Sequence, residues 1–169
     1  MPVNYANLEA TARPGAFSMF DMQVLVPELQ ELEEGQVYLE VGVDKGRSLE
    51  VARRTAHPAV DINGVDIRPD PEVAGTHFYQ LDSHVPESAE KVNKKIDVLF
   101  IDGDHTYEGC KADIDVWSKW VVPGGVMLFH DADETSPGVV QAIEEYCKEN
   151  NKEAWFDPNV QCGMARIVL

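Results

Sequence analysis

Acidic residues and histidines gather in five short stretches, each directly after an apolar segment of the kind that forms a buried strand. Two carboxylates that meet in one crevice repel each other unless one is protonated or a cation lies between them. Histidine exchanges protons near neutral pH. These residue types are therefore suited to proton transfer, or to holding a hard divalent cation such as Mg²⁺. The residues are Glu40, Asp66, Asp82, Asp102, His105, His130 and Asp131.

Residues 36–48, QVYLEVGVDKGRS, combine an apolar strand, two glycines and the start of a helix. Glycines let the backbone approach a ligand closely, and the free N–H groups at a helix start face it. The spacing is one residue short of a P-loop and lacks its lysine, and Val43 stands where a dinucleotide fingerprint needs a second glycine. The remaining pattern, E-x-G-x-x-x-G-x-S, predicts a cradle whose acceptor Glu40 suits a ligand with donors or positive charge. The alternative is a tight turn without a ligand.

The acid at position 66 ends a second predicted strand, about 20 residues after the glycine turn. Carboxylates at this place bind ribose hydroxyls in doubly wound folds, so we expect Asp66 to do so. Its alternative role is a helix cap or a solvated turn acid.

The elements that must position these residues follow from periodicity and from the glycine and proline positions. We expect strands near residues 37–41, 61–67, 76–80, 96–101, 126–129, 154–156 and 164–169. Helices are expected near residues 17–32, 46–57, 86–95, 107–121 and 137–150, with Ser136 as an N-cap. Pro27 predicts one kinked helix or two short ones, and Pro123-Gly124-Gly125 predicts a turn before the fifth strand.

Two longer motifs carry a family resemblance: F-I-D-G-D-H-T-Y-E-G at residues 100–109 and P-G-G-x-x-x-F-H-D at residues 123–131. With the glycine turn, they resemble class I S-adenosylmethionine-dependent methyltransferases of the methyltransferase domain 24 type. That type is related to catechol-type O-methyltransferases. The resemblance covers most of residues 37–145. It implies an α/β, Rossmann-like, seven-stranded and mostly parallel sheet, with helices on both faces and a C-terminal antiparallel hairpin.

The resemblance also implies a cofactor site for S-adenosylmethionine. Glu40 and the Gly42 backbone would hold the methionine portion, Asp66 the ribose and Ile67 one adenine face. Asp82, assisted by Ser83, would meet the adenine amino group. The full expected set is Glu40, Gly42, Gly46, Ser48, Asp66, Ile67, Asp82, Ser83 and Asp102.

A metal and a base are implied at the ends of strands four and five. Asp102 and Asp131 match the two acids that hold the metal in catechol-type enzymes, so Mg²⁺ or another divalent cation is expected there. Ala132 stands at the position of the family's asparagine ligand, so Asp133, His130 or water would have to replace it. His105 stands where those enzymes carry a lysine base, and it is the expected general base. Its alternative role is to orient the loop.

The expected catalytic residues are His105, Asp102 and His130, with His130 as a second base or a metal ligand. The implied reaction is in-line methyl transfer, of the O-methyl type, to a small hydroxylated molecule. The first alternative is a catalytically inactive module that binds S-adenosylmethionine or S-adenosylhomocysteine. The second, a nicotinamide dehydrogenase, is disfavoured by Val43. Residues 1–16 and 133–138 are the expected walls of the acceptor pocket.

Composition restricts the class of protein further. The 169 residues carry 14 Lys+Arg against 30 Asp+Glu, a net charge of -16 that repels nucleic acid and anionic membranes. Three cysteines without a C-x-x-C pair, and no apolar run near 18 residues, favour a cytoplasmic protein. We expect an N-terminal arm or lid at 1–15 and a single domain at 16–169. A homo-oligomer could complete the pocket.

Overall fold

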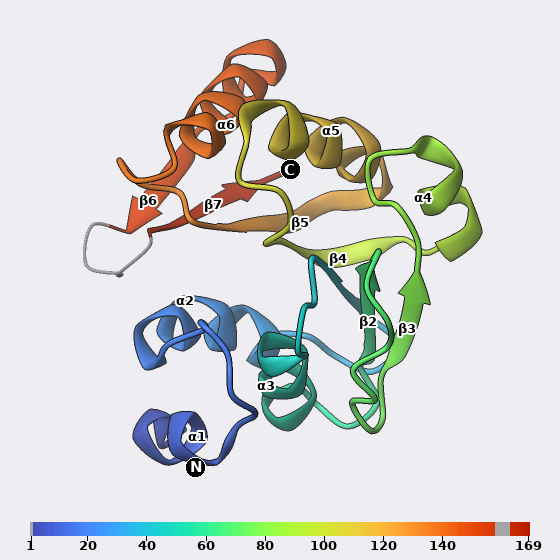
Figure 1. The fold of residues 1–169 in the computed structure, drawn as a ribbon, viewed down its shortest axis with the longest axis vertical. Coiled ribbons are helices and arrows are strands. Elements are labelled where there is room, and N and C mark those ends of the chain that lie inside the picture. Colours follow the sequence, from blue (N-terminus) through green and yellow to red (C-terminus); the bar gives the residue numbers. More distant parts are fainter. Residues whose placement is uncertain (1, 158–162) are drawn as a thin grey trace.

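The computed structural model describes residues 2–157 and 163–169, which form one seven-stranded sheet with helices on both faces (Figure 1). The strands run in the order β3-β2-β1-β4-β5-β7-β6. Strands β1 to β5 pair in parallel, whereas β7 is antiparallel to both β5 and β6. The predicted mostly parallel sheet with a C-terminal antiparallel hairpin is therefore confirmed. The strands are β1 (Val37–Val41), β2 (Asp61–Asp66), β3 (His77–Gln80), β4 (Ile96–Ile101), β5 (Val121–His130), β6 (Ala154–Asp157) and β7 (Met164–Val168).

The two central strands, β1 and β4, have apolar sequences because both of their faces are covered. All five residues of β1 are buried, and only Asp97 of β4 is partly exposed. Strand β2, the next strand along the chain, pairs with one edge of β1, and β4 pairs with the other edge of β1. This reversal of strand order opens a crevice at the carboxyl ends of β1 and β4, where open α/β sheets bind their ligands.

The helices divide into two layers, and each layer encloses its own core against the sheet (Figure 1). Side chains of α1, α2 and α3 pack with Tyr38 and Phe100 on one face, and those of α4, α5 and α6 pack with Leu39 and Phe129 on the other. The helices are α1 (Tyr5–Thr11), α2 (Met19–Gln30), α3 (Arg47–Thr55), α4 (Pro86–Val92), α5 (Tyr107–Trp117) and α6 (Pro137–Asn150), with a short 3₁₀ turn at Ser118–Trp120.

The N-terminal segment forms more regular structure than its sequence indicates. Residues 5–11 form α1, whose Leu8 is buried in the core with α2. Helix α2 contains Pro27 and continues past it to Gln30 as one helix. Of the two predicted alternatives, the structure has one helix and not two short ones.

The Pro-Gly-Gly segment is not a turn before the fifth strand, as predicted, but lies inside β5. The backbone N–H of Gly124 donates to the carbonyl oxygen of Leu169 (2.7 Å), and Leu169 N–H donates to Gly125 (3.0 Å). Gly124 has a φ of 83°, and the pairing of β5 with β4 shifts register between Ile96 and Val98. An irregular strand held by the C-terminus replaces the expected turn. Ser136 precedes α6, but its side chain makes no capping hydrogen bond.

Among the described residues, no helix has the length and apolar character needed to cross a membrane. Cys110 and Cys147 are buried free thiols, and Cys162 lies outside the described residues.

Candidate active site

Two adjoining cavities, of about 380 and 320 Å³, lie along the carboxyl ends of the parallel strands. Both are lined by Gly42, Asp102 and Gly103, so together they form one crevice across the ends of β1 and β4. The first cavity extends past β2 and β3 and is lined by Asp66, Ile67, Arg68, Asp82, Ser83, His84 and Asp104, among others. The second extends past β5 and is lined by Gly15, Ala16, Phe17, Arg47, Ser48, His105, His130 and Asp131, among others.

The crevice depends on the glycine at the end of β1. Gly42 has a φ of 86°, in the left-handed region that glycine favours. A Cβ added at this position would lie 2.2 Å from the carbonyl oxygen of Asp102. Only glycine therefore allows the loops after β1 and β4 to approach each other this closely, which makes the loop a suitable cradle for a cofactor.

Asp66 fastens the glycine loop from the end of β2. One of its oxygens accepts hydrogen bonds from the backbone N–H groups of Val43 and Asp44, both at 2.8 Å, and the other accepts from Arg68 N–H at 2.8 Å. The Arg68 guanidinium pairs with the Asp44 carboxylate beside it. Asp66 thus lines the first cavity while it holds the backbone of two loops in place.

Glu40 lies behind the glycine loop, not on the surface of the crevice. Its side chain is fully buried, and its two oxygens form hydrogen bonds with the hydroxyls of Tyr38 (2.8 Å) and Ser48 (2.5 Å). Burial raises the pKa of Glu40 to about 8, although both hydrogen bonds lower it. Glu40 is therefore protonated and neutral at pH 7, and the crevice does not expose the charged acceptor that the sequence indicated.

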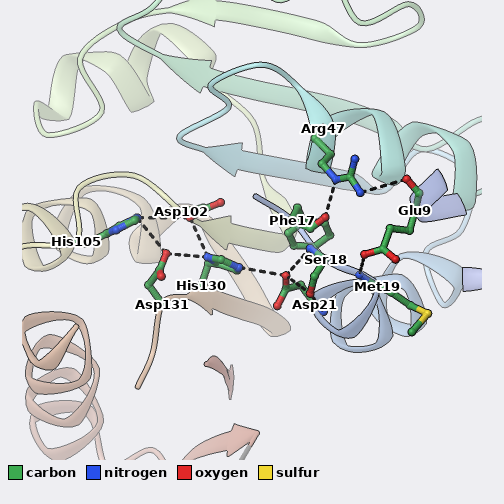
Figure 2. Close-up of polar contacts among 10 residues, drawn as sticks. All are labelled: Glu9, Phe17, Ser18, Met19, Asp21, Arg47, Asp102, His105, His130 and Asp131. Atoms are coloured by element: carbon green, nitrogen blue, oxygen red, sulfur yellow. Dashed lines mark hydrogen bonds and ion pairs between the residues drawn. The ribbon is translucent and has the colours of Figure 1, made fainter. Parts of the chain in front are cut away.

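The catalytic candidates form a cluster of two carboxylates and two imidazoles (Figure 2). His130 Nδ1 lies 2.7 Å from Asp131 Oδ2 and 3.4 Å from Asp102 Oδ1. His105 Nε2 lies 3.2 Å from Asp131 Oδ2 and 3.7 Å from Asp102 Oδ1. The sheet brings β4 and β5 side by side, so their terminal acids converge as predicted.

These contacts shift the proton affinities of the cluster. Burial opposes a charge on His130, but its contacts with Asp102, Asp131 and Asp21 prevail and raise its pKa to about 12. The contact with Asp102 raises the pKa of His105 above its ordinary value. Burial raises the pKa of Asp102, but both histidines outweigh this effect and lower it. The imidazoles therefore supply positive charge to the acid pair.

Asp21 is a member of the site that the sequence analysis missed (Figure 2). It comes from the first turn of α2, is only 1% exposed, and its Oδ2 lies 3.5 Å from His130 Nε2. The same oxygen accepts hydrogen bonds from the backbone N–H and the hydroxyl of Ser18, at 2.6 and 2.7 Å. Ser18-x-x-Asp21 is legible in the sequence as a capping box, but its contact with β5 is not.

Arg47 ties the N-terminal segment to the glycine loop (Figure 2). From the first turn of α3 it donates to the carbonyl oxygens of Phe17 (2.6 Å), Glu9 (3.2 Å) and Arg13. Glu9 in turn accepts from the backbone N–H of Met19 at 2.7 Å. Residues 15–17 thereby form a wall of the second cavity.

The donor set at the end of β4 and β5 fits a divalent cation by distance. One ligand atom each from Asp102, His105 and Asp131 lie within 4.8 Å of one another, a spacing that oxygen and nitrogen ligands around one ion can have. Ala132 is buried and offers no ligand atom, so His105 takes the third place in this set. His105 Nε2 cannot be a metal ligand and the general base at the same time.

Of the remaining predicted site residues, Ser48, Ile67, Asp82 and Ser83 line the crevice. Gly46 does not, because it is the left-handed N-cap of α3 and packs against Pro71 and Val73. Of the expected acceptor walls, Gly15 and Ala16 line the second cavity. Asp133, Glu134 and Pro137 instead line a separate cavity of about 500 Å³ beside α6.

Solved structures share this fold at low sequence identity. MycE methyltransferase from the mycinamycin biosynthetic pathway, in complex with Mg and SAH, is 17% identical with a TM-score of 0.73; the alignment covers 99% of this chain and 55% of that chain. A putative caffeoyl-CoA O-methyltransferase from Staphylococcus aureus is 13% identical with a TM-score of 0.71, over 99% of this chain and 92% of that chain.

The sequence comparisons identify the family. An uncharacterized protein, R132, of Acanthamoeba polyphaga mimivirus is 33% identical over 69 residues, which span 40% of this chain and 31% of that relative's length. The family model described as a methyltransferase domain matches residues 39–132, which include the glycine turn, the D-G-D-H motif and the end of β5. More than half of the chain lies within this match, and the chain belongs to the methyltransferase domain family that the sequence motifs predicted.

Proposed function

We propose that this protein transfers a methyl group from S-adenosylmethionine to a hydroxyl group of a small molecule. The observation that carries the proposal is the cluster of Asp102, His105, His130 and Asp131, which lies beside a glycine-lined cavity at the same sheet edge. A module that only binds a cofactor does not need such a cluster of proton-exchanging groups.

The crevice suits this cofactor in shape and in charge. The close loops at Gly42 and the acids Asp66, Asp82 and Asp102 provide acceptors for ribose, adenine and a cationic sulfonium. The Ser48 hydroxyl and the backbone after Gly42 line the second cavity, where the methionine portion would extend. Bound S-adenosylmethionine would supply an electrophilic methyl group, and the protein would orient the acceptor beside it.

His105 is our proposed general base. Its side chain is 49% exposed and faces the second cavity, where an acceptor hydroxyl can reach it. The unprotonated fraction of His105, which grows as pH rises through its raised pKa, takes the hydroxyl proton, and Asp102 and Asp131 stabilise the imidazolium that forms. His130 is too deeply buried for an acceptor to reach it. Its role is to hold Asp102 and Asp131 in place through its contacts with both carboxylates.

A divalent cation is the alternative use of the same cluster. Asp102, Asp131 and His105 would hold it, and a bound metal would lower the pKa of an acceptor hydroxyl. In that case His105 is a ligand and the base lies elsewhere.

The test is turnover on a panel of phenols and sugars, measured by mass spectrometry, with and without excess EDTA. We expect methylated product with at least one acceptor. Activity that survives EDTA supports His105 as base, and activity restored only by Mg²⁺ or Mn²⁺ supports the cation. Tight binding of S-adenosylhomocysteine without product on any acceptor would favour the inactive module.

Two variants separate cofactor binding from chemistry. Asp66→Ala is expected to weaken binding of S-adenosylhomocysteine at least 100-fold, because it removes a ribose acceptor and releases three loop N–H groups, each hydrogen bond to a charged group being worth about 1.5–3 kcal/mol. His105→Ala is expected to leave that affinity unchanged and to lower kcat at least 100-fold. Calorimetry and initial rates measure the two effects. Equal loss of binding in both variants would contradict this division of roles.

A further inference from the structure

The guanidinium of Arg47 is bound entirely by backbone carbonyl groups. Its Nε donates to the carbonyl oxygen of Phe17 at 2.6 Å, and its two terminal nitrogens donate to those of Glu9, at 3.2 Å, and Arg13. Among the described residues, no carboxylate lies within ion-pair distance of this side chain. The fixed fork of a guanidinium can hold several acceptors in one arrangement, so these contacts indicate that Arg47 positions a stretch of backbone.

Arg47 contacts the segment 13–17 at both of its ends and in its middle. The carbonyl oxygens of the first and last residues accept hydrogen bonds from the guanidinium. A Cβ on Gly15 would lie 3.0 Å from the Cβ and the Cδ of Arg47, so the glycine packs against the arginine stem. The segment belongs to no helix or strand, and in the described part of the chain no backbone–backbone hydrogen bond involves it. Its course therefore depends on side chains, and on Arg47 above all.

The same segment is a wall of the second cavity. Gly15, Ala16 and Phe17 line this cavity, as do Arg47 and the next residue, Ser48. Arg47 lies in the first turn of α3, directly after the glycine loop, so it attaches the wall to the element that follows that loop. A ligand that extends from the glycine loop into the second cavity therefore lies against a wall whose place Arg47 sets.

Phe17 carries the wall inward to the catalytic cluster. Its side chain is buried, and its ring centroid lies 5.9 Å from that of His130 and 5.8 Å from that of Phe100. Figure 2 shows Phe17 between Arg47 and His130. Loss of the Arg47 contacts would leave the backbone of the segment free to move away from the cavity while this ring still holds its inner end.

We infer that Arg47 is a positioning residue for the amino-acid end of the cofactor, because it holds residues 13–17 in place as the wall against which that end lies. The inference rests on the proposed function, which directs the methionine portion of S-adenosylmethionine into the second cavity. Arg47 acts through the backbone of the segment and not by attraction of its charge for the ligand. The family match includes Arg47 but begins at residue 39, so the segment that it holds lies outside the match.

The experiment compares two ligands by isothermal titration calorimetry of the full chain. S-adenosylhomocysteine carries the amino-acid end, and 5′-methylthioadenosine has the same nucleoside and sulfur with a methyl group in its place. We expect the wild type to bind S-adenosylhomocysteine at least about tenfold more tightly, since its charged end adds hydrogen bonds. In Arg47→Met this ratio should fall to about 1, through weaker binding of S-adenosylhomocysteine alone. Arg47→Lys should also lower the ratio, because an ammonium group keeps the charge but lacks the guanidinium fork.

Arg54→Met is the matched control. Arg54 lies on the same helix and also bonds to the N-terminal segment, at the hydroxyl of Thr11 (2.7 Å), but it lines neither cavity of the crevice. Its replacement removes the same charge and should keep the wild-type ratio.

Three results would overturn the inference while the proposed function stands. A wild-type ratio in Arg47→Lys would show that charge, and not the placement of the segment, holds the ligand; this variant decides the question even if Arg47→Met does not fold. Equal weakening of both ligands in Arg47→Met would show an effect on the whole crevice. A wild type that binds both ligands equally would show that the wall does not contact the amino-acid end. Failure of the wild type to bind S-adenosylhomocysteine would instead overturn the proposed function.

Discussion

At the scale of single residues, Glu40 differs most from what its sequence position indicates. A carboxylate after a buried strand reads as a charged acceptor for a cofactor, yet this side chain is enclosed by Tyr38 and Ser48. A protonated Glu40 can accept from one hydroxyl and donate to the other, so it joins β1 to α3 beneath the glycine loop. Glu40 then contributes to the site by fixing the shape of the glycine loop, and it presents no charge to a ligand.

The variant Glu40→Gln tests the protonated state. The amide resembles the neutral acid, so near pH 4, where the unfolded state is also mostly protonated, the free energy of unfolding should change by less than about 1 kcal/mol. Glu40→Ala should lower it by about 3 kcal/mol, because two buried hydroxyls lose their partner. Urea unfolding measures both effects.

The pH dependence of the same variants follows from linkage. The pKa of Glu40 is raised in the native state from 4.5 to about 8, so between these values the native state binds more protons than the unfolded state. Wild-type stability should therefore fall relative to Glu40→Gln as pH rises from about 5 to 8, by at most about 1.4 kcal/mol per pH unit. A gap between the two proteins that stays constant across this range would contradict a neutral Glu40.

Local patterns explain which residues of the site could be predicted from the sequence. Asp102 and Asp131 each follow an apolar strand, and the parallel order of the sheet brings strand ends together, so their meeting follows from the sequence alone. The contact between Asp21 and His130 does not, because it depends on how α2 packs against β5. The hydrogen bonds that enclose Glu40, with Tyr38 and Ser48, likewise depend on packing that the strand pattern does not show.

At the scale of secondary-structure elements, α2 is the clearest case of a helix that both packs in the core and contributes a side chain to the candidate active site. Its first turn caps the helix through Ser18 and supports His130 through Asp21, so one carboxylate serves both tasks. The family match covers residues 39–132, so Asp21 lies outside the matched region and its partner His130 lies inside it.

Two substitutions in this turn separate capping from the ion pair. Ser18→Ala removes the cap and should cost about 1 kcal/mol of unfolding free energy. Asp21→Asn keeps an acceptor for the Ser18 N–H but removes the charge that faces the buried His130, and it should cost about 3 kcal/mol. Urea unfolding of both variants checks this order. Equal losses would mean that Asp21 only caps the helix.

Elements also mark where prediction from the sequence failed. The Pro-Gly-Gly segment reads as a turn because its residues favour one, but pairing with the C-terminal residue incorporates it into β5. The places of most strands and helices followed from the apolar runs, and the mostly parallel sheet followed from the family resemblance, whereas this exception required a partner strand that lies far along the chain.

At the scale of the whole molecule, the net charge of -16 gives the crevice an electrostatic preference. Six aspartates line its two cavities, against Lys45, Arg47 and Arg68. S-adenosylmethionine carries a sulfonium charge that S-adenosylhomocysteine lacks, so added salt should weaken the first ligand more than the second. Titrations at about 50 and 500 mM NaCl measure the difference. Parallel changes for both ligands would show that the field of the acids does not reach the sulfonium position.

The most direct test of the central claim is a crystal structure of the full chain soaked with S-adenosylhomocysteine and Mn²⁺. We predict the nucleoside in the first cavity, its ribose at Asp66, and its homocysteine portion directed past Gly42 toward Ser48. Electron density between Asp102 and Asp131 would decide whether a cation binds beside the nucleoside. A crevice that stays empty at saturating ligand, or a ligand bound at another face, would contradict the account.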